Sequence, residues 1–184
     1  MEDHKVSKYY RVYADVDLDI ITSNVEALMK LTPESTGAIA VVKADGYGHG
    51  DVAVAKAVDS KVQMFAVATL DEAVNLRENG IDKPILILGF VNVDEYETLV
   101  KNNVTASIFD YETAKELDEV ASDLGMKALC HIKVDTGMRR IGLEPDKTGA
   151  SIVKDINSLK NLEVSSFFLN LSANMFHNSS RDTD

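Results

Sequence analysis

The stretch Ile39-Ala-Val-Val-Lys-Ala-Asp-Gly-Tyr-Gly-His-Gly50 joins a short apolar run, a lysine and a loop with three glycines. Ile39 to Val42 has the length and β-branched character of a strand buried on both faces. Lys43 stands where that strand is expected to end. Barrels built from parallel strands gather their catalytic groups at the carboxyl ends of those strands. The stretch therefore predicts a parallel β/α fold with a lysine at its functional rim.

Five further apolar runs follow along the chain and resemble the first. They are Phe65 to Ala68, Ile85 to Leu88, Val104 to Ile108, Ala128 to Val134 and Val164 to Leu169. Continuous runs of this kind, separated by helical segments, are typical of parallel strands.

Signals for helices lie between the runs. Thr69 with Glu72, and Asn92 with Glu95, fit capping boxes, in which the two side chains satisfy each other's backbone N–H groups. Asp110 is suited to cap the segment that follows it. The expected helices cover residues 19–31, 52–58, 69–80, a short segment after 92, and 110–125.

This alternation indicates about six β/α units. A complete (β/α)8 barrel takes roughly 250 residues, so we expect an incomplete (β/α)8 TIM-type barrel over residues 1–184. A doubly wound open sheet is the alternative, because periodicity alone does not separate the two architectures.

The composition favours a globular protein that acts on small molecules. Of the 184 residues, 45% are hydrophobic and 27% are charged, and the net charge is −11. So acidic a chain is not expected to bind nucleic acid or an anionic membrane. No apolar run is long enough to span a bilayer, and the first ten residues carry no secretion signal. We expect a cytoplasmic protein, with the single cysteine, Cys130, buried in a strand rather than acting as a nucleophile.

Position alone leaves the role of the rim residues open. A lysine at a strand end commonly covers apolar surface with its stem while its ammonium group reaches water. Tyr47 is equally suited to packing over the rim. No set of residues has the spacing of metal ligands.

The motifs decide between these alternatives. Ala40 to Gly50 resembles the cofactor-attachment signature of alanine racemases. Ala14 to Asp19, with Asn24, resembles the opening of that family, and His131 to Gly142 resembles its second signature. The order of these three stretches and the spacing between them also agree with the family. The resemblance covers about residues 10–165.

The resemblance implies a role for four residues. Lys43 would form the Schiff base with pyridoxal 5′-phosphate and then act as one of two bases at the substrate α-carbon. Tyr47 would help hold the cofactor phosphate. Arg140 would face the cofactor's phenolic oxygen and the substrate carboxylate, and Lys133 matches a lysine that many members carry as a carbamate. Arg139 is given no role.

The implied activity is that of an isomerase, which interconverts L-alanine and D-alanine and supplies D-alanine for peptidoglycan. The family forms homodimers and has a C-terminal β-domain that provides the second base. We expect that domain to be absent from these 184 residues and the chain to be inactive alone. The alternatives are a single-domain protein of pyridoxal-phosphate homeostasis and a non-functional gene fragment.

The last residues, 166–184, diverge from the family pattern. Asn170 stands near the position of a family histidine that stacks on the cofactor, and Asn174 stands near a family aspartate. We interpret this tail as a truncated or frameshifted end. We favour this interpretation over a new specificity, and we expect the preference for alanine over serine to depend largely on pocket residues outside these 184.

Overall fold

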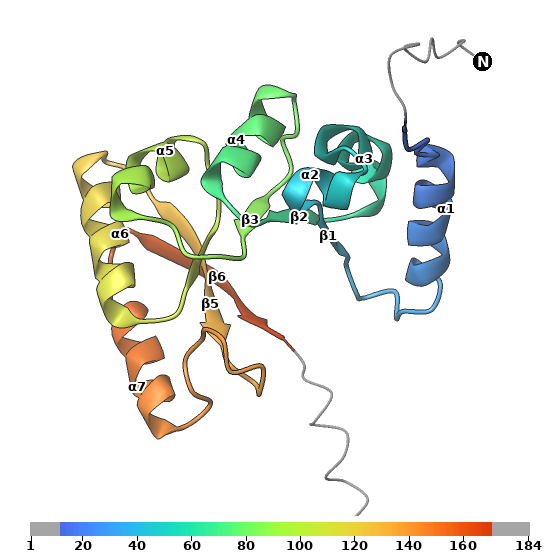
Figure 1. Ribbon diagram of the computed structural model, residues 1–184. Helices are drawn as coiled ribbons and strands as arrows, with labels where there is room; N and C mark the ends of the chain where they lie inside the picture. Colours follow the sequence, from blue (N-terminus) through green and yellow to red (C-terminus); the bar gives the residue numbers. More distant parts are fainter. Residues whose placement is uncertain (1–11, 171–184) are drawn as a thin grey trace, which may run out of the picture.

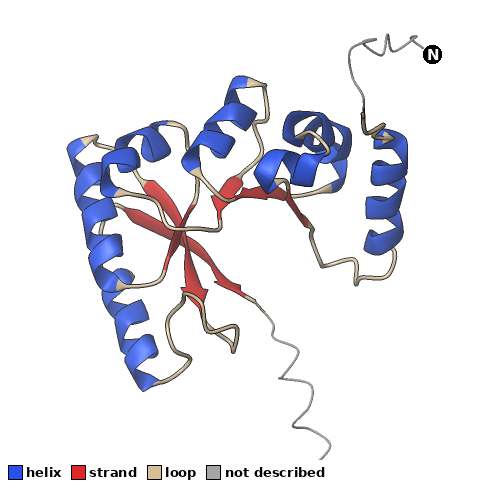
Figure 2. Ribbon diagram, in the orientation of Figure 1, coloured by secondary structure: helices blue, strands red, loops and turns tan. Residues whose placement is uncertain are grey.

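The computed structural model describes residues 12–170, which form a curved layer of strands with helices around its outside (Figures 1 and 2). The strands are β1 (Ile39–Val41), β2 (Met64–Val67), β3 (Ile85–Ile87), β4 (Ala106–Ile108), β5 (Ala128–Val134) and β6 (Leu162–Leu169). Each of them falls on a predicted apolar run, and no end differs from the prediction by more than two residues.

The strands lie side by side in the order in which the chain makes them. Two parallel sheets, β1-β2-β3 and β4-β5-β6, are joined by a parallel bridge between Leu86 and Thr105. A doubly wound sheet reverses its strand order at a switch point, and no reversal occurs among the described strands. The prediction of an incomplete (β/α)8 barrel is therefore confirmed.

Most of the helices cover the outer face of this layer, and the first one packs against the third (Figure 2). The helices are α1 (Leu18–Met29), α2 (Lys43–Gly48), α3 (Asp51–Val58), α4 (Leu70–Glu78), α5 (Tyr96–Lys101), α6 (Tyr111–Asp123) and α7 (Lys147–Ile156), with 3₁₀ turns η1 (Asp59–Lys61) and η2 (Val93–Glu95). The two predicted capping boxes are present, and Asp110 caps α6 by accepting the N–H of Thr113 at 2.7 Å. Sequence reasoning did not predict α7, which Asp146 caps by accepting the N–H of Gly149.

The hydrophobic core lies between the helices and the outer face of the strands. On β5, Cys130 and Ile132 are fully buried in that core. Because successive residues of a strand point to opposite faces, His131 and Lys133 point to the inner face. On β5 the inner face thus carries polar side chains, and the rim at the carboxyl ends of the strands is where a site is expected.

None of the helices in the described part of the chain is long and apolar enough to cross a membrane.

Candidate active site

The backbone that follows β1 makes a left-handed turn. Ala44, Asp45, Gly46 and Tyr47 all have φ between 52° and 59°, so the segment labelled α2 in Figure 1 is not an ordinary α-helix. Left-handed backbone costs about 1–2 kcal/mol for each residue that has a Cβ, and three of these four residues have one. Such strain persists only where the surroundings impose it.

Hydrogen bonds on both sides of the turn hold it in place. The N–H of Gly46 donates to the carbonyl oxygen of Val42 at 2.9 Å, across the turn. The carboxylate of Asp45 accepts the N–H of Asp51 at 3.1 Å and so joins the turn to the start of α3. Gly46 itself is buried, and a Cβ there would lie 3.2 Å from the backbone nitrogen of Asp51. The turn is a fixed element that sets the exit of the chain from β1.

Lys43 and Tyr47 lie on this turn and close to each other. The Lys43 side chain is half-buried, and its Nζ lies 5.9 Å from the centroid of the Tyr47 ring. Tyr47 is 60% exposed. Its phenol projects from the same turn as the lysine amine.

Lys133 lies one residue before the end of β5 and is only 2% exposed. Its Nζ lies 3.9 Å from the centroid of the Phe168 ring on β6. Burial lowers the pKa of the Lys133 ammonium, the charge of Arg140 lowers it further, and Asp135 opposes the shift. A larger share of this amine is neutral near physiological pH than in an exposed lysine.

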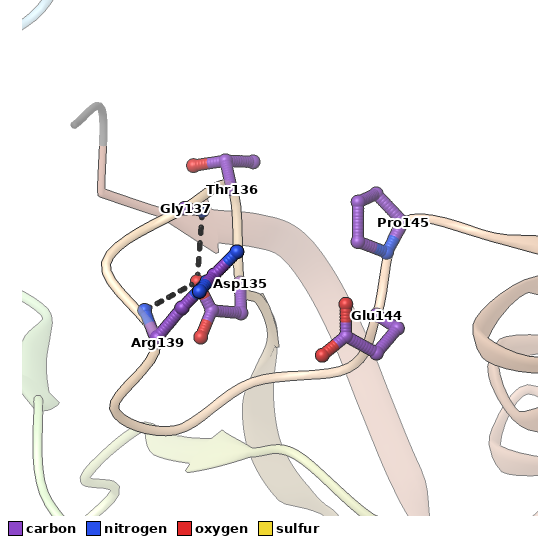
Figure 3. A pocket seen from close by; sticks show the side chains of 6 residues that line it. All are labelled: Asp135, Thr136, Gly137, Arg139, Glu144 and Pro145. Carbon is purple, nitrogen blue, oxygen red and sulfur yellow. Dashed lines mark hydrogen bonds between the residues drawn. The ribbon is translucent and has the colours of Figure 1, made fainter. Parts of the chain in front are cut away.

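Arg140 is exposed on the loop that follows β5. Asp135 organises that loop, since its Oδ1 accepts the backbone N–H groups of Gly137 at 2.9 Å and Arg139 at 3.0 Å (Figure 3). These bonds lower the pKa of the Asp135 carboxyl. A cavity of about 420 Å³ opens beside the loop and is lined by Asp135, Thr136, Gly137, Arg139, Glu144 and Pro145. Lys43 and Arg140 do not line this cavity.

The loop after β5 also contacts the end of β6. The Thr136 hydroxyl donates to the carbonyl oxygen of Asn170 at 2.6 Å. The Asn170 amide nitrogen lies 3.3 Å from the sulfur of Met138. Asn174, the other position at which the family pattern is lost, lies outside the described residues.

The four predicted residues belong to one rim. Lys43 follows β1, Tyr47 is on the turn beyond it, Lys133 is the next-to-last residue of β5 and Arg140 is on the loop after β5. Because all the strands are parallel, their carboxyl ends meet at the same edge. The rim offers three kinds of group: an amine that can condense with an aldehyde, a phenol hydroxyl, and cationic side chains. Together they fit a ligand that carries an aldehyde and anionic substituents. Pyridoxal phosphate has this chemistry.

Three features of the site were not recognised from the sequence. Glu72 was assigned only to the capping box, although it also contacts the turn after Lys43 at Ala44. His131 was given no role of its own, yet it lies on the inner face of β5, where burial lowers its pKa and favours the neutral ring. Phe168 gave no signal, because its contact with Lys133 depends on the pairing of β5 with β6.

Cys130 is as predicted. It is fully buried on the core side of β5. Burial raises the pKa of its thiol to about 12, so the nucleophilic thiolate is not formed at neutral pH.

The strand order and the residues at the rim define the class of protein. It is a parallel β/α barrel domain that presents amines at the carboxyl ends of its strands. A sequence model described as "Alanine racemase, N-terminal domain" matches residues 16–182. The chain belongs to this family. Alanine racemases are isomerases that depend on pyridoxal phosphate.

Curated relatives and solved structures that resemble this chain are also alanine racemases. An alanine racemase of Clostridium perfringens (strain SM101) is 42% identical over 162 residues, which cover 88% of this chain and 42% of the relative. The structure of an alanine racemase from Clostridium difficile 630 superposes with a TM-score of 0.83 at 37% identity, over 85% of this chain and 41% of that one. The chain spans about two fifths of the length of these relatives.

A third similarity concerns the fold only. A histidine racemase from Leuconostoc mesenteroides superposes with a TM-score of 0.78 at 24% identity, over 85% of this chain and 42% of that one. The same barrel therefore serves a racemase of a different amino acid, and the fold does not by itself determine the substrate.

Proposed function

We propose that this chain forms the pyridoxal-phosphate-binding part of an alanine racemase and that Lys43 is the residue to which the cofactor attaches. The position of Lys43 supports this most directly. Its amine leaves the carboxyl end of β1 on a strained, fixed turn, at the rim shared with Lys133 and Arg140. Strained backbone held by its surroundings is common at catalytic sites.

Each residue at the rim has a proposed task. Lys43 binds the cofactor's aldehyde carbon and afterwards holds or releases a proton at the substrate α-carbon. The hydroxyl of Tyr47 donates to the cofactor phosphate. The permanently charged guanidinium of Arg140 faces the cofactor's phenolic oxygen and the substrate carboxylate, for which a planar fork is well suited. When bound, pyridoxal phosphate withdraws electrons from the α-carbon and makes its hydrogen acidic.

Lys133 is proposed to carry a carbamate. Only the neutral amine adds to carbon dioxide, and burial beside Arg140 lowers the Lys133 pKa in the direction that supplies it. The addition releases one proton from the amine nitrogen to solvent, and the product is an anion near the permanently charged guanidinium of Arg140. It would replace the repulsion between Lys133 and Arg140 with an attraction that orients the arginine.

Racemisation needs a second acid–base group on the opposite face of the α-carbon. In the family that group comes from a C-terminal β-domain across a dimer interface. We propose that these 184 residues, taken alone, bind the cofactor but do not racemise alanine at an enzymatic rate. With its partner domain, the proposed role is the supply of D-alanine for peptidoglycan in the cytoplasm.

The test is to fix the cofactor on the chain. Pyridoxal phosphate is titrated onto the purified chain, reduced with borohydride, and located by peptide mass spectrometry. We expect a saturable absorbance band and a label on Lys43, both lost in Lys43→Ala and both kept in Lys154→Ala, which removes an exposed lysine of α7. A label spread over surface lysines and unchanged in Lys43→Ala would contradict the proposal.

A further inference from the structure

Glu72 joins the carboxyl ends of two neighbouring strands. It lies in the first turn of α4, and its side chain is half-buried. Its Oε1 accepts the N–H of Ala44, directly after Lys43, at 2.7 Å. Its Oε2 accepts the N–H of Ala68, directly after β2, at 2.7 Å. One carboxylate therefore ties the turn beyond β1 to the end of β2.

The bond to Ala44 lies where the backbone is least stable by itself. Ala44 has φ 52° and ψ 53°, a left-handed conformation that its Cβ disfavours. Its N–H is part of the peptide that links it to Lys43, so the bond fixes the direction in which the chain leaves the lysine. A carboxylate is a charge-assisted acceptor and forms a stronger bond than a neutral group would.

Capping α4 does not require this second contact. Glu95 occupies the same position in the other capping box, and it accepts the N–H of Asn92, its own N-cap residue, at 3.0 Å. The hydrogen bonds found for the Glu95 carboxylate go only to that residue, whereas the Glu72 carboxylate also reaches Ala44 in the turn beyond β1. The difference between two otherwise equivalent glutamates indicates an additional role for Glu72.

We propose that Glu72 is a positioning residue for Lys43: it holds Ala44 in the left-handed conformation and thereby presents the lysine amine to the cofactor at the rim. This inference rests on the proposed function, because it assumes that Lys43 binds pyridoxal phosphate. The Glu72 side chain itself is not assigned any contact with cofactor or substrate.

Glu72→Gln separates the two roles of this side chain. Glutamine serves in a capping box as well as glutamate, so the start of α4 is kept. Glutamine offers one acceptor oxygen instead of two, so Ala44 and Ala68 can no longer both be satisfied. The matched control is Glu95→Gln, which makes the same chemical change in a box without the second contact.

Two readouts are measured on each variant. The first is the concentration of pyridoxal phosphate that half-saturates borohydride-fixed labelling of Lys43. We expect it to rise about tenfold in Glu72→Gln and to stay unchanged in Glu95→Gln, with similar thermal unfolding for both. The second is hydrogen exchange at the Ala44 amide without cofactor, which we expect to become faster only in Glu72→Gln.

A rescue variant tests the backbone mechanism directly. Glycine adopts the left-handed conformation without a steric penalty, so adding Ala44→Gly to Glu72→Gln should restore labelling towards the wild-type value. Equal labelling in Glu72→Gln and wild type, or no rescue by Ala44→Gly, would overturn the inference. If wild type itself is not labelled at Lys43, the proposed function fails, and Ala44 exchange still decides whether Glu72 holds the turn.

Discussion

Lys133 is a buried lysine, and its protonation should affect stability as well as chemistry. Its pKa in the folded chain is below the ordinary 10.5, so between the two pKa values the unfolded chain holds more protons. The free energy of unfolding therefore rises with pH in that window. Lys133→Met removes the buried charge and should stabilise the chain by about 1 kcal/mol at pH 7, an advantage that shrinks as pH approaches 10.5.

Urea denaturation at pH 7 and pH 9.5, in buffers free of carbon dioxide, measures this difference. Lys154→Met is the control, since that exposed side chain should give no pH-dependent difference from wild type. An advantage of Lys133→Met that grows with pH would show that the sign of the shift is wrong.

Individual residues of the site were predictable from the sequence because long motifs carry them. Lys43 and Arg140 are recognised by the flanking residues of the two family signatures. The conformation that presents Lys43 was not predictable, because Ala44 and Tyr47 do not favour a left-handed turn and only contacts from α3 and α4 impose it. Local preference is overridden here by tertiary structure.

The last turn of helix α4 stabilises the barrel at the amino-terminal ends of its strands, opposite to the candidate site. The Arg77 guanidinium donates to four carbonyl oxygens, those of Ile81 (2.6 Å), Lys83 (2.7 Å), Asn102 (3.1 Å) and Asn103 (3.0 Å). These groups precede β3 and β4. Arg77→Lys cannot reproduce the planar fork, and we expect it to lower the free energy of unfolding by about 2–4 kcal/mol.

Chemical denaturation measures this loss, and cofactor labelling of Lys43 in the variant should retain the wild-type half-saturation at temperatures where it is folded. Lys101→Met is the control, because it removes an exposed ion pair with Glu97 and should leave stability unchanged within error. A loss no larger than that of the control would mean that the Arg77 bonds contribute little.

The elements themselves followed from periodicity where the pattern was strong. Apolar runs located all six strands, and capping boxes located the start of α4 and the turn η2. Helix α7 was missed because it follows a long loop whose length obscured its start, although Ile152, Val153 and Ile156 have helical spacing. Periodicity alone left the strand order open between a barrel and a doubly wound sheet, since the order depends on pairing between distant segments.

At the scale of the whole molecule, the described barrel has two strands with a single neighbour each. Within residues 12–170, β1 pairs only with β2, and β6 pairs only with β5. Apolar side chains near these edges are exposed: Ile39 by 48% and Val41 by 41% on β1, Phe167 by 54% and Leu169 by 45% on β6. Unpaired edges that carry apolar side chains are sites of association between chains.

We therefore expect the purified 184-residue chain to self-associate as its concentration rises. Phe167→Lys and Leu169→Lys place charges along the β6 edge, where lysine discourages edge-to-edge pairing, and should shift the chain towards monomer. Val93→Lys charges an equally exposed apolar residue on η2, away from both edges, and should leave association unchanged. Sedimentation velocity over a range of concentrations measures all four proteins. If wild type stays monomeric, or if Val93→Lys is as effective as the edge variants, the open edges are not the cause of association.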